Sequence, residues 1–163
     1  MAKRYVFKMK GWTDYFILSI SKTRKQMHND IIKVSNGVGD KCDFVVENAA
    51  ALVKSMDSLD SNGNLLHSLC FLNVEDLTFN IIVHECVHLA INREAISLRF
   101  GLDYSKMDRS DEERLAYYTG EITEAVTVFL KNNGYLDNKA WKAKPTVEWE
   151  MCGEVLSQTI KLA

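Results

Sequence analysis

Residues 77–91 are largely apolar and contain two histidines four positions apart. The apolar members of this segment are Leu77, Phe79, Ile81, Ile82, Val83, Val87, Leu89 and Ile91. They fall on nearly every side of a helix, and a helix that is apolar all round is typical of a buried element. The sequence therefore predicts a long buried helix from Val74 to about Arg99, with Asn73 as its N-cap and Gly101 after its end.

The predicted helix carries the motif His84-Glu85-Cys86-Val87-His88. Residues four apart lie on one helix face, so His84 and His88 have the spacing needed to bind one metal ion. Glu85 is rotated by about 100° from His84, which places its carboxylate where it can deprotonate a metal-bound water. Cys86 lies roughly 200° round and should face the core. The alternative is two hydrogen-bonded core histidines with Glu85 as a surface acid.

A catalytic zinc ion held by two histidines needs a third protein ligand and an open position. His28 and His67 lie upstream, and no histidine follows His88. The downstream candidates are therefore acidic: Glu112, Glu113, Glu121 and Glu124. We expect Glu113 to be the ligand, with Glu112 as the next candidate. The alternative for Glu113 is a capping box with Ser110 at the start of a helix.

This second helix is predicted from Ser110 to Asn133, with Gly134 after its end. One face carries Glu113, Ala116, Tyr117, Gly120 and Glu124. Because Ala116 and Gly120 are small, this face is expected to cross closely over the motif helix. The opposite face, with Leu115, Tyr118, Ile122, Ala125, Val126 and Phe129, is expected to pack on the core.

The spacing of these residues resembles a known family. His84-Glu85-x-x-His88, followed 25 residues later by Glu113-x-x-Ala116, is similar to the gluzincin branch of zinc metallopeptidases over less than half of the chain. The region 82–120 also resembles small metallopeptidase-like proteins of tailed bacteriophages. Gluzincins usually carry an aspartate four residues after the ligand glutamate, where it orients a zinc-bound histidine. Here that position is Tyr117, so the groups that orient the ligands must differ.

The resemblance implies a zincin-like α+β fold, in which a small mixed or antiparallel sheet packs on the long motif helix and a second helix crosses behind. It also implies Zn²⁺ as cofactor and peptide hydrolysis, with Glu85 as general base. Tyr117 or Tyr118 is a candidate donor to the oxyanion. An edge strand above the motif helix is expected to hold the extended peptide or protein substrate, and Leu65–Leu72 is the candidate. The competing hypothesis is a zinc-binding protein of this fold that acts by binding a partner.

The remaining patterns predict strands at Tyr5–Met9, Tyr15–Ile20 and Ala51–Met56, although residues 44–54 could also be helical. Helices are expected at Ser21–Val34, with Met27, Ile31 and Ile32 inward, and at Val147–Ile160. With 163 residues and no linker or repeat, we expect one domain spanning residues 1–163.

Composition bounds the partners and the compartment. The net charge of −2 gives no support for a nucleic-acid or anionic-membrane partner. No apolar run reaches the roughly 18 residues of a membrane span, and no apolar signal region opens the chain. We therefore expect a cytoplasmic protein, in an infected bacterium if the phage resemblance holds. The four widely spaced cysteines are expected to be reduced thiols rather than a disulfide framework.

Overall fold

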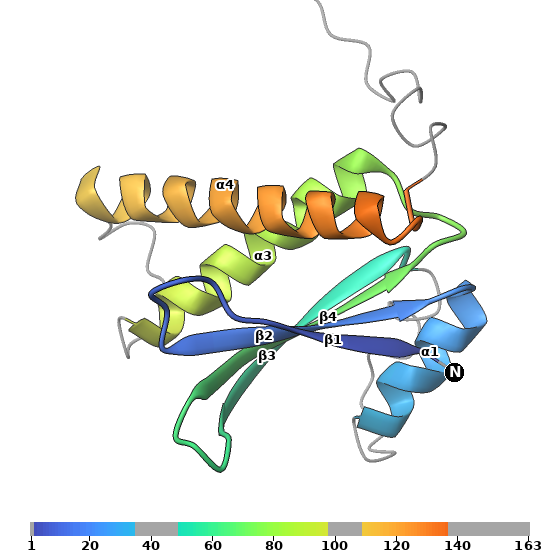
Figure 1. Cartoon of the computed structure of the whole chain (residues 1–163), viewed down its shortest axis with the longest axis horizontal. Helices are drawn as coiled ribbons and strands as arrows, with labels where there is room; N and C mark the ends of the chain where they lie inside the picture. The colour runs from blue at the N-terminus through green and yellow to red at the C-terminus, as the bar shows by residue number, and fades with distance from the viewer. Residues whose placement is uncertain (1, 35–48, 98–108, 137–163) are drawn as a thin grey trace, which may run out of the picture.

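The structure is a computed structural model that describes residues 2–34, 49–97 and 109–136. It is an α+β fold, as predicted from the sequence, with one four-stranded mixed sheet and three helices in the described ranges (Figure 1). The elements are β1 (Lys3–Phe7), β2 (Asp14–Ser21), α1 (Arg24–Val34), β3 (Ala51–Leu59), β4 (Leu65–Asn73), α3 (Phe79–Ser97) and α4 (Arg109–Asn132). None of the described helices is long and apolar enough to cross a membrane. The helix predicted at Val147–Ile160 lies outside the described residues.

The sheet has the strand order β1-β2-β4-β3. β1 pairs antiparallel with β2, β2 parallel with β4, and β3 antiparallel with β4 through a hairpin. The turn of this hairpin contains Gly63, whose φ of 77° is a conformation that favours glycine. β4 therefore has a partner on both sides, and the prediction that Leu65–Leu72 forms an edge strand is wrong. β4 is buried along almost its whole length, as a central strand should be. β3 is the edge strand on this side.

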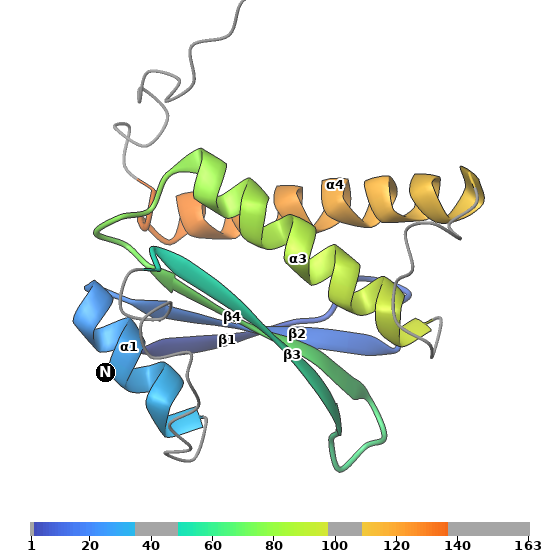
Figure 2. The ribbon, with the colours of Figure 1, turned by 180° about the vertical axis from the view of Figure 1, so that it is seen from behind.

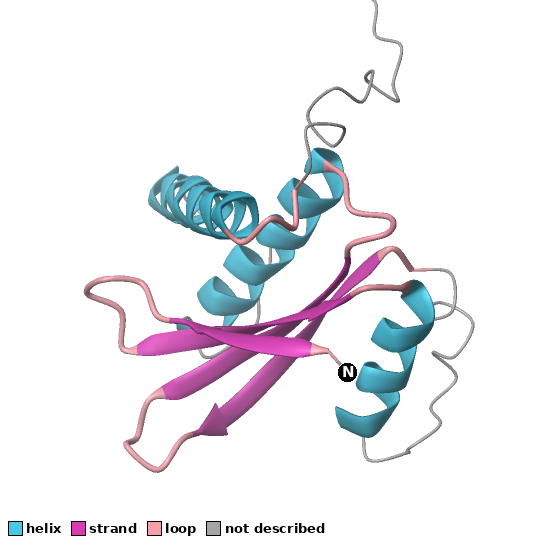
Figure 3. Cartoon of the chain, turned by 45° about the vertical axis from the view of Figure 1, so that its right-hand side comes forward, coloured by secondary structure: helices cyan, strands magenta, loops and turns pink. Residues whose placement is uncertain are grey.

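Two layers of helix cover the two faces of the sheet (Figures 2 and 3). α3 and α4 pack over one face, and the larger core between them is built around Phe16, Leu18 and Leu89. α1 packs on the other face, where Met27 and Ile31 contact Phe71 of β4. The prediction that Ile32 also points inward is wrong, because its side chain is 42% exposed.

The motif helix begins five residues later than the sequence suggested. β4 continues through Asn73, whose side-chain oxygen accepts a hydrogen bond from the Asp76 amide at 3.0 Å and so shapes a turn. The N-cap is Thr78, whose hydroxyl accepts from the Ile81 amide at 3.3 Å. The helix is also buried on one side only, because Phe79 is 38% exposed while Ile82 is buried. The predicted burial all round is therefore wrong.

α4 ends at Asn132, one residue before the predicted Asn133, and Gly134 follows it with a φ of 71°. The face expected to pack on the core does so, since Ile122 and Val126 are buried. The face expected to cross α3 does not: Ala116 is exposed, and a Cβ at Gly120 would meet nothing within 4 Å. The prediction of a close crossing at these small residues is therefore wrong. The larger apolar side chains of the opposite face bury more surface, and this decides which face of α4 turns inward.

Candidate metal centre

The two motif histidines meet on the outer face of α3. The Nε2 atoms of His84 and His88 are 3.1 Å apart, and their ring centroids are 4.7 Å apart in an edge-to-face arrangement. Both residues are exposed. Burial, with a smaller contribution from His84, lowers the pKa of His88. Both effects favour the neutral imidazole, which is the form that binds a metal ion.

Glu85 points the other way, toward the sheet. It is only 6% exposed, and burial raises its pKa, although the charge of His84 opposes the shift. The Cys70 thiol of β4 lies near enough for Glu85 to contribute, after burial itself, to the raised pKa of that thiol. The alternative prediction, two core histidines beside a surface glutamate, is wrong: the two histidines are exposed and Glu85 is buried. A raised pKa makes the Glu85 carboxylate a stronger base than an exposed glutamate.

The donor set of this pair fits a zinc ion. With Zn–N bonds of about 2.0–2.1 Å in tetrahedral geometry, two nitrogen ligands lie about 3.3–3.4 Å apart. The observed separation of 3.1 Å between the two Nε2 atoms is within a few tenths of an ångström of that value. The same separation is that of a hydrogen bond between one protonated and one unprotonated Nε2, so the pair is arranged for either contact. Cys86 faces away from them into the core, as predicted, and burial raises its pKa to about 12, so its thiol is not a competing ligand.

The third ligand is not brought to this pair in the described part of the chain. Within the described ranges no group of three His, Cys, Asp or Glu side chains is arranged to bind a metal ion. Glu113 and Glu112 are both exposed on α4. The capping box proposed as the alternative role for Glu113 is not seen either. The helix starts at Arg109, and the Ser110 hydroxyl accepts a hydrogen bond from Arg114 at 3.4 Å.

An ion pair between a buried glutamate and a half-exposed arginine ties the start of α4 to α3, and sequence reasoning missed it. Glu94 is completely buried, and its Oε1 accepts from Nε and Nη2 of Arg114 at 3.1 and 2.9 Å. Arg114 also donates to Asp111 one turn earlier. This pair holds the acidic first turn of α4 against the motif helix. The signal that could have found it is Glu94 itself, a charged residue on the inner side of an apolar helix, where a partner is required.

The two candidate tyrosines have different surroundings. Tyr117 is 64% exposed on the outer face of α4, and a hydrogen bond with Glu121 raises the pKa of its hydroxyl. Tyr118 is part of the packing: its ring lies 5.5 Å from the Trp12 ring and 3.9 Å from the Arg93 guanidinium carbon. Of the two, only Tyr117 stays a candidate donor for the reaction. That Tyr117 donates a hydrogen bond to the oxyanion stays a prediction.

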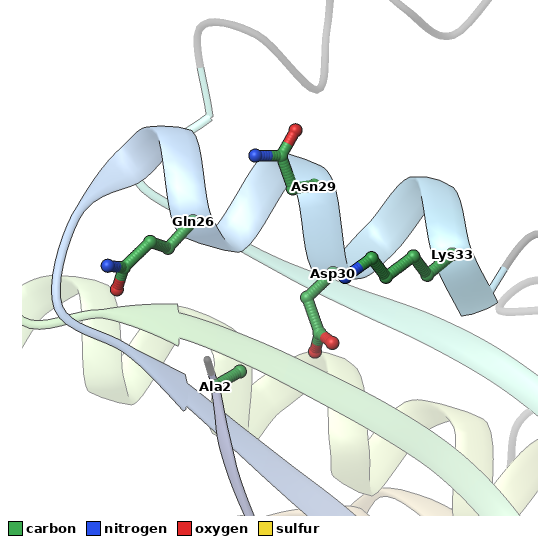
Figure 4. Close-up of a pocket in the computed structure, with 5 residues that line it drawn as sticks. All are labelled: Ala2, Gln26, Asn29, Asp30 and Lys33. Atoms are coloured by element: carbon green, nitrogen blue, oxygen red, sulfur yellow. The ribbon is translucent and has the colours of Figure 1, made fainter.

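A shallow polar pocket lies elsewhere, between α1 and the start of β1 (Figure 4). It is lined by Ala2, Gln26, Asn29, Asp30 and Lys33. Asp30 is already engaged, because its two oxygens accept from Arg4 and from the Ser19 hydroxyl at 2.6 Å each. The pocket lies on the α1 side of the sheet, opposite the side that α3 covers, and it contains no histidine or cysteine. It is therefore separate from the candidate metal centre.

Comparisons with known proteins add no identity: no protein-family model, curated protein or solved structure matches the chain. The function is therefore inferred from the motif and from the geometry of α3.

Proposed function

We propose that this protein is a zinc-dependent peptidase whose metal centre is built on His84 and His88 of α3. The observation that carries the proposal is the 3.1 Å separation between the Nε2 atoms of the two exposed histidines. The carboxyl of Glu85, the residue after His84 on α3, is buried on the side that faces the sheet. Two imidazoles and a proton-accepting carboxylate are the groups that metal-assisted hydrolysis requires. The resemblance to gluzincins described above supports the same chemistry.

In this proposal each residue of the site has a separate role in hydrolysis. A bound zinc ion would supply a lowered pKa for water and a polarised scissile carbonyl. His84 and His88 would hold the ion, and Glu113 of α4 is the proposed third ligand. Glu85 accepts the proton of the attacking water and donates it to the departing amine. Tyr117 is the proposed hydrogen-bond donor to the oxygen of the carbonyl under attack.

The strand proposed to pair with the substrate is β3, in place of the β4 segment predicted from the sequence. Because β4 is central, its backbone groups are taken by β2 and β3. β3 is the edge next to α3, which contacts both β3 and β4. Its pairing with β4 is regular from Ala51 to Ser55 and shifts register before Ser58. We therefore propose that the 51–55 stretch pairs with an extended peptide or protein substrate.

A second candidate is a zinc-binding protein of the same fold that acts by binding a partner and hydrolyses little or nothing. The observation that favours it is the absence, within the described ranges, of a third ligand beside the histidine pair. The gluzincin aspartate replaced here by Tyr117 favours it as well. Turnover by the purified protein distinguishes the two candidates.

Metal content tests the centre itself. We expect about one zinc per chain in wild type and far less in His84→Ala and His88→Ala, because each substitution removes one of the two imidazole ligands. Elemental analysis of the purified proteins measures this, and His28→Ala on α1 is the matched control that should keep its zinc. Equal zinc in all four proteins would overturn the metal assignment.

Replacement of the two glutamates tests the third ligand. Glu113→Ala should weaken zinc binding by at least 10-fold, as loss of even a group that only orients a metal ligand does, whereas Glu112→Ala should leave it unchanged. Both residues are exposed on the first turns of α4, so neither substitution should cost much stability. Competition with a chromophoric zinc chelator measures the affinities. A loss confined to Glu112→Ala would move the ligand by one residue, and no loss in either variant would remove both glutamates from the centre.

A further inference from the structure

His67 occupies an unusual position in the central strand. In the parallel pairing of β2 with β4, Tyr15 is opposite Leu66 and Phe16 is opposite Ser68. His67 is therefore the extra residue of a β-bulge, a feature that re-aims a side chain. Its ring lies 5.7 Å from the Phe16 ring, within the larger core, and the residue is completely buried.

The hydrogen bonds around His67 suit only a neutral ring. Nδ1 lies 3.1 Å from the Ser68 hydroxyl oxygen, which also accepts from the side-chain amide of Asn92 on α3 at 3.1 Å. The other ring nitrogen, Nε2, is buried and has no hydrogen-bond partner in the described structure. A protonated ring would carry an N–H at Nε2 with no acceptor. An unmatched buried donor of this kind, on a charged group, is costly.

The charged groups that face His67 do not offset the cost of protonating its buried ring. Among the described residues these are Asp14 of β2 and Arg93 of α3, which act in opposite directions on the imidazole. Asp14 is moreover already bound by Arg93, whose Nε donates to both carboxylate oxygens at 3.2 and 3.0 Å. Desolvation dominates and lowers the pKa of His67 from 6.5 to about 4. The neutral ring is thus the form that the bulge holds at neutral pH.

We infer that His67 makes the attachment of the second half of α3 to the sheet acid-sensitive, through the contact His67–Ser68–Asn92. Protonation places an unmatched charge directly beneath Asn92 and Arg93. The lowest-energy response is to let water reach the ring, which means separating this part of α3 from the β2–β4 bulge. Since Asn92 is one helical turn beyond His88, the same motion loosens the helix that carries the histidine pair. The inference does not depend on metal binding or on catalysis.

The direction of the effect follows from the two protonation states. His67 takes up a proton more readily in the unfolded chain than in the folded one. Stability is therefore full above the unfolded pKa of 6.5 and is lost as the pH falls toward about 4. Between pH 8 and pH 5 this single group should raise the unfolding equilibrium constant by about 30-fold.

Urea unfolding of the full metal-free chain at pH 8 and pH 5 tests this in wild type and His67→Phe. Phenylalanine fills the site without a titrating group. Between pH 8 and pH 5, the unfolding equilibrium constant should therefore rise about 30-fold more in wild type than in His67→Phe. His28→Gln on α1 should behave like wild type. Equal increases, within a factor of three, in wild type and His67→Phe would overturn the inference.

Two further measurements on wild type test the inference even if His67→Phe does not fold. In wild type, the NMR signal of the His67 ring carbon should show no protonation until about pH 4; a midpoint at pH 6 or above would contradict the inference. At pH 5, amide exchange in the Asn92 turn of α3 should be faster relative to exchange in α1 than it is at pH 8, after correction for intrinsic rates. An unchanged ratio would show that acid does not release α3.

Discussion

Replacing Glu85 by glutamine should abolish most hydrolysis while leaving zinc content and fold unchanged. Glutamine keeps the size and polarity of the side chain in a site where Glu85 is 6% exposed, but it cannot accept the proton. General-base catalysis is typically worth about 10²–10⁴-fold, so turnover should fall by that factor. Cleavage of a proteome-derived peptide library by wild type and Glu85→Gln, with zinc measured in the same samples, gives the comparison.

The matched control is Glu75→Gln, an exposed carboxylate in the turn before α3 that the proposal does not use. It should hydrolyse like wild type. If Glu85→Gln keeps its zinc and cleaves as well as wild type, Glu85 is not the base. If wild type cleaves nothing while its zinc is intact, the partner-binding candidate replaces the peptidase.

Local signals in the sequence mark the approximate places of the described strands and helices. The Ser61-Asn62-Gly63-Asn64 run between the strand candidates at 51–56 and 65–72 is a strong turn signal and predicts the β3–β4 hairpin. Asp60, just before this run, accepts hydrogen bonds from the Asn62 and Asn64 amides. The i, i+4 spacing of His84 and His88 likewise fixes their shared face, whatever the tertiary structure. These predictions depend on chain geometry alone.

The predictions that failed required tertiary information. No local signal says that β2 pairs with β4 rather than leaving β4 at an edge, because parallel pairing joins segments distant in sequence. The rotation of α4 was misjudged for a similar reason: Ala116 and Gly120 mark a possible close approach, but competition between two faces is decided by the total apolar area buried. The third metal ligand depends on that same rotation, which is why Glu113 remains a prediction.

Contacts of Arg93, which no local sequence signal predicts, join three separate parts of the fold. The guanidinium of Arg93 on α3 contacts two aromatic rings that are inclined at 74° to each other, with its central carbon 3.4 Å from the Trp12 ring centroid and 3.9 Å from that of Tyr118. The same group donates to both oxygens of Asp14. Arg93 and Asp14 are only 13% and 16% exposed. The β1–β2 turn, α3 and α4 therefore meet at one partly buried cation.

Arg93→Ala should be the most destabilising single substitution among the charged residues of this contact, at about 3–5 kcal/mol. It leaves Asp14 without its cation in a site of low exposure, and it removes two cation–π contacts of about 0.5–2 kcal/mol each, although these contributions are not additive. Arg93→Lys should recover only part of the loss, because an ammonium group cannot stack on an aromatic ring as a planar guanidinium does. Urea denaturation followed by circular dichroism at pH 8 measures the free energies of unfolding.

Arg24→Ala is the matched control for this prediction. Arg24 also pairs with an aspartate, at 2.8 Å from Asp76, but it is 43% exposed and no described aromatic ring stacks on it. An exposed pair of this kind contributes about 0–1 kcal/mol and weakens with salt. The Arg93 effect should therefore exceed the Arg24 effect at least threefold and should persist in 0.5 M NaCl. If the two substitutions cost the same, or if salt removes the difference, burial and stacking do not strengthen the Arg93 contact, and the three elements are held by the apolar core alone.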